Sequence, residues 1–211
     1  MSPAAPPGEA VEVSGGKWWD TLRSLARAVW RAPEQLLHPL RRWAARKALA
    51  RGPAPCSVLV VCYGNICRSP FAAALLERRL AGTIRVESAG FLGLGRPVPP
   101  IGLQVAARRG IDLSAHRSQI LTAAVAQAAD LIVVMDGEQE RAVRAVLGAA
   151  RPVLVVLGDL DPGPIETRAV RDPIWQPADV FEETYARIDR CIAELVAAMT
   201  MGEGGRVKGD G

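Results

Sequence analysis

Along most of this chain, short apolar runs alternate with stretches in which apolar residues recur every three or four positions. The short runs are rich in β-branched residues, which is typical of buried strands. Four such strands are expected, at Ser57–Val61, Ile84–Glu87, Leu131–Met135 and Val153–Leu157. Helical periodicity predicts helices over residues 69–80, 99–109, 122–129, 137–149 and 178–199. Strands that alternate with helices predict an α/β fold, here a four-stranded parallel sheet flanked by helices.

The segment before the first strand, residues 17–52, has an amphipathic helical pattern of its own. Basic residues lie opposite an apolar arc that contains Trp18, Trp19, Leu22, Leu25, Ala26, Val29 and Trp30. Pro33 is expected to break this helix, and a second helix then continues through Leu36, Leu40 and Trp43. The sequence Gly52-Pro53-Ala54-Pro55 cannot continue a helix and predicts a linker.

The two ends of the chain lack any periodicity. Residues 1–16 and 202–211 are therefore expected to be disordered. This leaves a single domain over residues 53–201 behind the helical extension, because 211 residues with 49% hydrophobic content suffice for one ordinary core. No apolar stretch is long enough to cross a bilayer, and the first residues do not have the pattern of a secretory signal.

Charge is distributed unevenly along the sequence. Residues 1–51 contain nine Lys or Arg against four Asp or Glu, whereas the rest of the chain is close to neutral. A basic character confined to the extension gives no reason to expect nucleic-acid binding by the main domain. Four irregularly spaced cysteines favour a reducing, cytoplasmic setting, and the preference for Arg over Lys favours a bacterial source.

The chemistry of the domain is concentrated directly after its first strand. There the sequence Cys62-Tyr63-Gly64-Asn65-Ile66-Cys67-Arg68-Ser69 leads straight into a helical pattern. Backbone N–H groups of so short a loop can converge on an anion, and the following helix adds its positive end. Arg68 can donate two parallel hydrogen bonds to a phosphate, and the same field favours the nucleophilic thiolate of Cys62.

This loop resembles the active-site signature of the low-molecular-weight protein tyrosine phosphatases. The resemblance covers about residues 56–200, through further matches at Ser88-Ala89-Gly90, His116-Arg117-Ser118, Met135-Asp136 and Asp172-Pro173. It implies the fold of the phosphotyrosine phosphatase I type. It also implies hydrolysis of a phosphate monoester, most typically phosphotyrosine in a protein substrate, through a cysteinyl-phosphate intermediate and without metal or cofactor.

The resemblance also implies a role for each residue of the loop. Cys62 would be the nucleophile, residues 63–69 (Tyr63, Gly64, Asn65, Ile66, Cys67, Arg68 and Ser69) would bind the phosphoryl group, and Arg68 would hold it throughout. Ser69 would hydrogen-bond the thiolate. Asn65 would shape the loop in a left-handed conformation, braced by Ser88 and His116.

Two Asp-Pro pairs compete for the part of the general acid that protonates the leaving phenolate. In the family this pair is followed, after a short stretch, by Phe-Glu at the start of the last helix. Asp172 precedes Phe181-Glu182 by nine residues and matches that spacing, whereas Asp161 lies in a Pro/Gly-rich segment after the fourth strand. We assign the acid to Asp172 and interpret Asp161 as a turn residue.

The expected walls of the substrate pocket depart from those of aryl-selective family members. Ile174 and Trp175 follow the Asp-Pro pair, so that one wall is aliphatic, and the segment after Gly90 has no aromatic at the usual wall position. Ile66 is typical of the tyrosine phosphatases, whereas the arginine-phosphate phosphatases of the family tend to have threonine there. This favours phosphotyrosine and leaves phosphoarginine as an alternative.

Three other interpretations stay open at this point. Arsenate reductases that share this loop need two further cysteines in mid-chain, but none lies between Cys67 and Cys191, and Cys191 itself falls among core positions of the last helix. A non-catalytic phosphate-binding or scaffold module would have no use for the nucleophile and the acid. Cys67 is close enough to Cys62 to form a reversible disulfide, or it is simply a packed loop residue.

No motif indicates the role of residues 17–51, so it is inferred from their hydrophobic pattern alone. A Trp-rich face opposite an Arg-rich face is typical of a helix at a membrane surface. Packing of that face on the domain, on a protein partner or on a second copy of the chain is the alternative, as is an organelle presequence. The oligomeric state does not follow from the sequence.

Overall fold

The computed structural model describes the backbone of residues 16–51 and 54–204 and the side chains of residues 33–51 and 54–200. Two sets of predictions lie outside these ranges: the disorder expected at residues 1–15 and 205–211, and the apolar arc between Lys17 and Arg31. Gly52 and Pro53 of the predicted linker also lie outside them.

A parallel four-stranded sheet in the order β2-β1-β3-β4 forms the centre of the domain. Its strands are β1 (Ser57–Cys62), β2 (Arg85–Gly90), β3 (Leu131–Val134) and β4 (Val153–Val156). The helices of the domain are α2 (Arg68–Arg79), α3 (Pro100–Arg108), α4 (Ala123–Gln127), α5 (Gly137–Leu147), the 3₁₀ helix η1 (Leu157–Leu160) and α6 (Ala178–Gly204). The predicted α/β fold is thereby confirmed.

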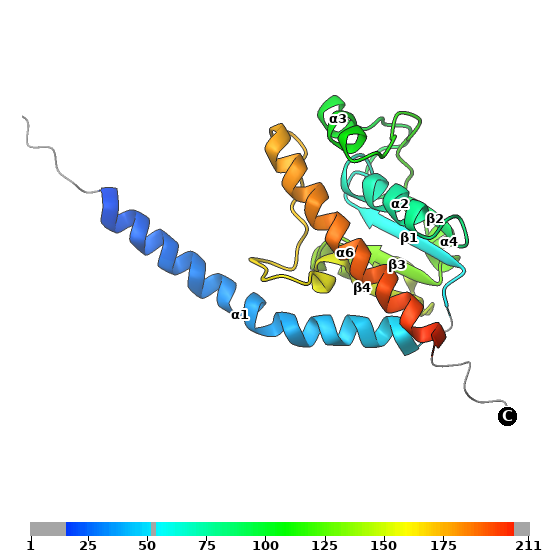
Figure 1. Cartoon of the computed structure of the whole chain (residues 1–211), viewed down its shortest axis with the longest axis horizontal. Coiled ribbons are helices and arrows are strands. Elements are labelled where there is room, and N and C mark those ends of the chain that lie inside the picture. The colour runs from blue at the N-terminus through cyan, green and yellow to red at the C-terminus, as the bar shows by residue number, and fades with distance from the viewer. Residues whose placement is uncertain (1–15, 52–53, 205–211) are drawn as a thin grey trace, which may run out of the picture.

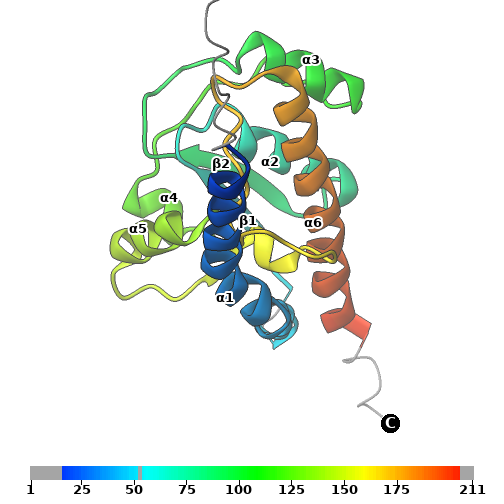
Figure 2. The same cartoon turned by 90° about the vertical axis from the view of Figure 1, so that its left-hand side faces the viewer.

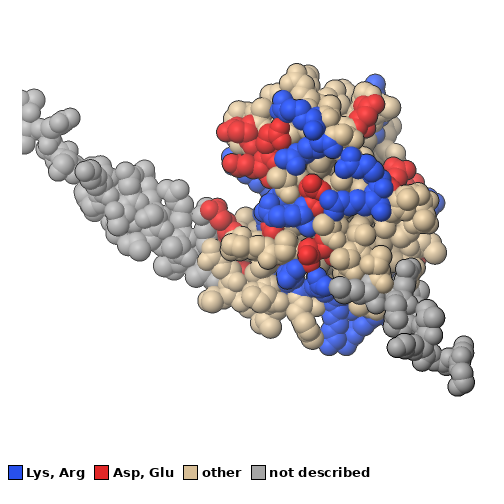
Figure 3. Space-filling view, in the orientation of Figure 1, with Lys and Arg blue, Asp and Glu red and all other residues tan. Residues whose placement is uncertain are grey.

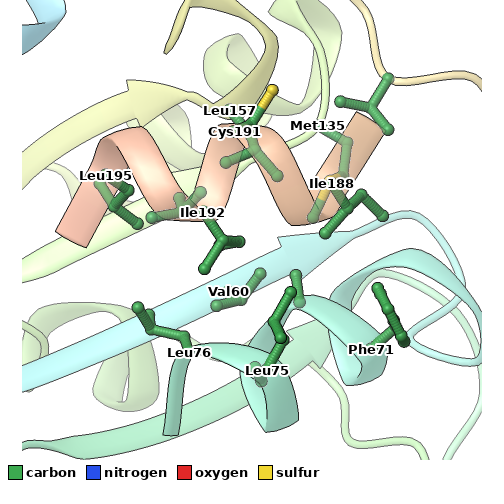
Figure 4. Packing of buried hydrophobic residues seen from close by; sticks show 14 of the residues in the cluster. Val60, Phe71, Leu75, Leu76, Met135, Leu157, Ile188, Cys191, Ile192 and Leu195 are labelled. Carbon is green, nitrogen blue, oxygen red and sulfur yellow. The ribbon is translucent and has the colours of Figure 1, made fainter. Parts of the chain in front are cut away.

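Alternating residues of β1 build two separate apolar layers because successive side chains of a strand point to opposite faces of the sheet. Val58, Val60 and Cys62 belong to the larger layer, which α2 and α6 cover, while Leu59 and Val61 face α4 and α5 on the other side (Figure 2). Figure 4 shows the larger layer, where the apolar side of α6 packs over β1 and α2 through Phe71, Leu75, Leu76, Ile188, Cys191, Ile192 and Leu195. Cys191 is fully buried there, as predicted for a core residue.

Strand β2 begins one residue later and ends three residues later than expected. It includes Ser88-Ala89-Gly90, which pair in parallel register with the last three residues of β1, so that Ser88 lies beside Val60 and Gly90 beside Cys62. These small residues have little strand propensity of their own, and the hydrogen bonds of the ladder hold them in place. The register brings Ser88 and Gly90 next to the candidate nucleophile.

The extension forms one helix, α1 (Gly16–Arg51), with Pro33 and Pro39 in its interior. The prediction that Pro33 ends a helix was therefore wrong, although the ribbon bends part-way along its length, as proline-containing helices do (Figure 1). The C-terminal half of α1 packs on α6 and η1, where Ala45 and Leu49 are buried. At the other end of the chain, α6 continues to Gly204, beyond the predicted boundary at residue 202.

Ion pairs connect α6 to the elements around it. Glu194 accepts from Arg42 and Arg46 of α1 at 2.6 and 2.5 Å, and Arg108 and Arg109 reach Glu182 at the other end of the helix. The space-filling view accordingly shows basic and acidic side chains interspersed over this side of the molecule (Figure 3). No helix among residues 16–51 and 54–204 is both long and apolar enough to span a bilayer.

Candidate active site

The loop between β1 and α2 places the predicted phosphate-binding residues around the N-terminus of α2. Because the first turn of a helix has backbone N–H groups without intrahelical partners, this end attracts anions. Residue Cys67 precedes α2, and its side chain makes no capping hydrogen bond. The amide groups of the first turn therefore stay available for a ligand in the loop.

Asn65 fixes the shape of this loop. Its φ of 50° is left-handed, as the resemblance implied, and its buried side-chain amide donates to Ser69 Oγ and to Ser88 Oγ, both at 2.9 Å. The amide oxygen accepts from the backbone of Gln119 at 2.8 Å, and the carbonyl oxygen of Asn65 contacts His116 Nε2 at 2.8 Å. Ser88 and His116 thus contact Asn65 from two directions, as expected, while the contact from Gln119 has no side-chain signature in the sequence.

Cys62 lies at the base of the loop with its thiol hydrogen-bonded from two sides. Ser69 Oγ donates to Cys62 Sγ at 3.0 Å, and the backbone N–H of Asn65 does so at 3.3 Å. Hydrogen bonds of this kind stabilise negative charge that develops on sulfur. The arrangement suits a nucleophile that must also depart as an anion.

Cys67 offers no second nucleophile. Burial, with the nearby Asp172 and Cys62, raises the pKa of the Cys67 thiol to about 12, so this thiol stays protonated at neutral pH. Below it, burial and the two cysteines raise the pKa of Tyr185, whose hydroxyl donates to the Cys67 carbonyl oxygen at 3.4 Å and whose ring stacks on Phe71. The stacked rings of Tyr185 and Phe71 therefore support the loop at Cys67.

Arg68 is almost fully buried, and its guanidinium is oriented by a segment far along the chain. Nη1 donates to the carbonyl oxygen of Val170 at 3.0 Å, and Nη2 hydrogen-bonds the carboxylate of Asp172. Asp136, which caps α5, lies 3.9 Å from Nη1. A bound phosphoryl group would replace the Asp172 carboxylate as the anionic partner of Nη2.

A cavity of about 190 Å³ opens at the thiol of Cys62. Its lining includes both predicted wall residues, Ile174 and Trp175, together with Tyr63, Leu92, Arg96 and Asp172. Trp175 has a left-handed φ of 61° and is 90% exposed, so it forms only the rim. A second cavity of about 640 Å³ adjoins the first, sharing Tyr63 and Asp172 and adding the aromatic ring of Phe91.

The two candidate acids lie in different surroundings. Asp172 lines the cavity, whereas Asp161 is not part of its lining and is completely buried between Arg187 (2.9 Å) and Arg190 (2.8 Å) of α6. Asp161 also accepts from Gly163 N at 3.3 Å, as expected of a turn residue, but the two arginine partners were not foreseen. Burial opposes its charge, yet these guanidinium groups hold the pKa of Asp161 below its ordinary value.

Replacing Asp161 by asparagine is expected to lower the free energy of unfolding by about 2–3 kcal/mol at pH 7, because two arginines lose their buried anion. A depressed pKa stabilises the fold above the unfolded value near 3.9. The difference between wild type and Asp161→Asn should therefore vanish as the pH falls through the folded pKa. Urea unfolding of both proteins between pH 3 and pH 7 measures this, and a pH-independent difference would contradict it.

Gly90 is required by the close approach of β2 to the loop. A Cβ atom there would lie 2.8 Å from the backbone nitrogen of Asn65 and 2.9 Å from the carbonyl oxygen of Cys62. Gly90→Ala is expected to displace the loop, lowering stability by about 1–3 kcal/mol and reducing phosphatase activity. Gly137→Ala is the matched control, because its Cβ would make only ordinary contacts with arginine side chains. Equal activities of the two variants would refute this role of Gly90.

Comparisons with known proteins agree with this geometry. The sequence model of the family described as "Low molecular weight phosphotyrosine protein phosphatase" matches residues 57–203. The chain therefore belongs to the low molecular weight phosphotyrosine protein phosphatase family. The match begins at β1 and leaves α1 outside the family domain.

Similar proteins are known from several bacteria. The chain is 42% identical over 135 residues to the "Probable low molecular weight protein-tyrosine-phosphatase EpsP" of Ralstonia nicotianae, which covers 64% of this chain and 89% of that protein. The crystal structure of the Erwinia amylovora tyrosine phosphatase AmsI superposes with a TM-score of 0.64 at 31% identity, over 70% of this chain and 95% of that one. The arginine phosphatase YwlE of Geobacillus stearothermophilus gives 0.65 at 25% identity, over 74% and 100%.

Proposed function

We propose that this protein hydrolyses phosphotyrosine in protein substrates, with Cys62 as nucleophile, Arg68 as phosphate ligand and Asp172 as general acid. The observation that carries the proposal is that Asp172, more than a hundred residues away from the loop, lines the same cavity as Cys62 and hydrogen-bonds Arg68, which lines the adjoining cavity. A thiolate, a cation and a carboxyl group supply the nucleophile, the phosphate ligand and the proton donor that both steps of the reaction require.

In the first step the Cys62 thiolate attacks phosphorus, a sulfur–phosphorus bond forms and the bond to the phenolic oxygen breaks. Asp172 gives its proton to that oxygen, so that tyrosine leaves as a neutral phenol. The N–H groups of residues 63–68 and the guanidinium of Arg68 stabilise the three equatorial oxygens of phosphorus as charge develops on them.

In the second step a water molecule attacks the phosphocysteine, and the Asp172 carboxylate takes its proton. Inorganic phosphate is released and Cys62 leaves as a thiolate. The hydrogen bonds from Ser69 Oγ and from Asn65 N stabilise that thiolate, which makes sulfur a good leaving group. The neutral Cys67 beside it takes no part in the transfer.

The cavity supports phosphotyrosine over phosphoarginine. Its lining joins Tyr63 with the apolar side chains of Leu92 and Ile174, which suits a flat aromatic ring above the loop. The adjoining cavity with Phe91 offers space for residues flanking the phosphotyrosine of a protein. Relatives named as tyrosine phosphatases support the same choice, and the similarity to an arginine phosphatase keeps phosphoarginine as the alternative.

Phosphate release from a phosphotyrosine peptide and from a phosphoarginine peptide tests this choice. Both assays use the full-length protein with reduced thiols in EDTA, so that any dependence on divalent metal would appear as lost activity. A kcat/KM that is higher for the phosphotyrosine peptide supports the proposal. A preference for phosphoarginine would assign the alternative substrate, and inactivity towards both would contradict the proposed function.

We further infer that α1 presents an apolar face to a membrane surface. Leu36, Leu40 and Trp43 recur at helical spacing and are 76%, 65% and 60% exposed, whereas Ala45 and Leu49 of the same helix are buried. Lys47 sits over the Trp43 ring at 4.1 Å, and such a pairing of cation and aromatic ring suits an anionic lipid interface. A protein partner at this face is the alternative.

Co-sedimentation with anionic vesicles compares wild type with the variant Leu40→Ser/Trp43→Ser. Loss of binding in the variant supports membrane docking through this face. Wild-type protein that stays in the supernatant would contradict it. A chain truncated before β1 is a poor control, because removal of α1 would expose the α6 surface on which Ala45 and Leu49 pack.

A further inference from the structure

The segment that carries Asp172 is held in place by the extension. We use the name acid loop for residues 161–177, which connect η1 to α6 and contain both Asp-Pro pairs. Two side chains of α1, Glu34 and His38, contact the backbone of this loop, His38 at its first residue and Glu34 in its middle. Both residues precede the part of the chain that matches the family model.

Glu34 binds the middle of the acid loop. Its Oε2 accepts a hydrogen bond from the backbone N–H of Arg168 at 2.9 Å. The guanidinium of Arg168 meanwhile binds Asp159 of η1 at 2.6 Å and Glu140 of α5 at 3.3 Å. Three elements therefore hold Arg168: η1 and α5 bind its side chain, and α1 binds its backbone N–H.

The position of residue 168 also determines where Val170 and Asp172 lie. The N–H of Val170 donates to the Met135 carbonyl just after β3, and its own carbonyl oxygen receives Arg68 Nη1 at 3.0 Å. Asp172 comes after another two residues and contacts the same guanidinium. A shift of the backbone at residue 168 would thus be passed along the loop to Asp172.

His38 holds the start of the loop. This buried imidazole lies with Nε2 at 2.9 Å from the carbonyl oxygen of Asp161, whose carboxylate is paired with Arg187 and Arg190. Arg187 in turn donates to the carbonyl oxygens of Ala169 and Thr167, both at 2.7 Å. The acid loop is therefore bound between α1 on one side and α6 on the other.

Glu34 is well suited to this contact because it stays ionised. Its partial burial opposes the charge, but the Arg168 N–H and the guanidinium of Arg41, 3.2 Å away, keep the pKa of Glu34 below its ordinary value. Hydrogen bonds to a charged acceptor are stronger than those between neutral groups. The contact of Glu34 with the loop is therefore a strong one at neutral pH.

We propose that Glu34 and His38 are positioning residues for the acid loop, so that the extension belongs to the catalytic unit and sets how Asp172 faces the substrate. Neither residue touches the reacting atoms. This inference rests on the proposed phosphatase function, which assigns Asp172 as the acid. It adds a part of the chain that the family domain does not contain.

The leaving group of the substrate reports on the acid specifically. An aryl phosphate with a basic leaving group, such as phenyl phosphate, depends on protonation by Asp172, whereas p-nitrophenyl phosphate with its stable phenolate depends on it little. Glu34→Ala is expected to lower kcat/KM for phenyl phosphate about tenfold and that for p-nitrophenyl phosphate about twofold, because a small misplacement of a catalytic group is costly. A merely structural loss would lower both values equally.

Two further variants test whether the effect comes from the hydrogen bond of residue 34, from its charge, or from the general attachment of α1 to the domain. Glu34→Gln keeps an oxygen within reach of the Arg168 N–H but removes the charge, so it is expected to lose less activity on phenyl phosphate than Glu34→Ala does. Glu194→Gln removes the ion pairs of α1 with α6 without touching the acid loop, and it should leave both values unchanged. Should Glu34→Ala unfold at the assay temperature, Glu34→Asp, which keeps the charge but shortens the reach, is expected to show the same selective loss.

The outcomes distinguish the two proposals. An inactive wild type would contradict the phosphatase function itself. An active wild type with Glu34→Ala or Glu34→Asp equal to it on both substrates would overturn the positioning role. An equal loss on both substrates would also overturn it, because it would show a general effect on the fold.

Discussion

Replacing Cys62 by serine is expected to reduce phosphate release from a phosphotyrosine peptide by about 10⁴-fold or more, to the background of the assay. The hydroxyl of serine is a far weaker acid than a thiol, and the hydrogen bonds from Ser69 and Asn65 are not enough to make it a nucleophile. Steady-state release of inorganic phosphate, measured with equal amounts of both proteins, checks this.

The matched control is Cys56→Ser. Cys56 is the exposed cysteine that directly precedes β1, and its replacement should leave the rate unchanged. The Cys62→Ser variant should still bind inorganic phosphate, because the N–H groups and Arg68 stay in place, and thermal protection by phosphate would demonstrate this. A Cys62→Ser protein that keeps its activity would refute the covalent mechanism.

Replacing Asp172 by asparagine is expected to lower kcat/KM for the same peptide by about 10²–10⁴-fold. The amide cannot protonate the phenolate, but it preserves the size of the side chain at the mouth of the cavity. The loss should be much smaller for p-nitrophenyl phosphate, whose leaving group needs less protonation. Kinetics on both substrates measure the difference.

Asp179→Asn, an exposed position at the start of α6, is the control carboxylate and should behave as wild type. An Asp172→Asn variant with an equal loss on both substrates would indicate that its contact with Arg68 matters more than its proton. A variant with unchanged kinetics would exclude Asp172 as the acid. Asp161 is fully buried, is paired with Arg187 and Arg190, and does not line the cavity at Cys62, so it is no alternative acid.

The sheet and the turn from β1 into α2 could be predicted because their signals are local. Buried strands have apolar β-branched runs, and the loop has a fixed spacing of Cys62 and Arg68 beside a helix start. The wrong expectation at Pro33 has a physical explanation. A proline removes one hydrogen bond of a helix, but the packing of the C-terminal half of α1 on α6 and η1 offsets that loss, and nothing near Pro33 in the sequence announces those distant contacts.

The parts of the site that the sequence did not reveal are backbone groups and long-range pairs. The carbonyl of Val170 orients Arg68, and a carbonyl group has no side-chain signature. The partners of Asp161 lie more than 25 residues further along, on a helix whose arginines follow no distinctive pattern in the sequence. Trp175 lines the cavity, but its high exposure goes with a left-handed backbone that no local pattern predicts for tryptophan.

The packing of α1 also dictates an order of events when the chain folds. This helix is synthesised before the whole sheet, yet its partners η1 and α6 lie more than a hundred residues later. The sheet and α2 can assemble from contacts that are closer in sequence, whereas α1 must wait for the last helix before its buried face is covered. Until then the face of α1 that contains Ala45 and Leu49 is uncovered, as it would be in a ribosome-bound or C-terminally shortened chain.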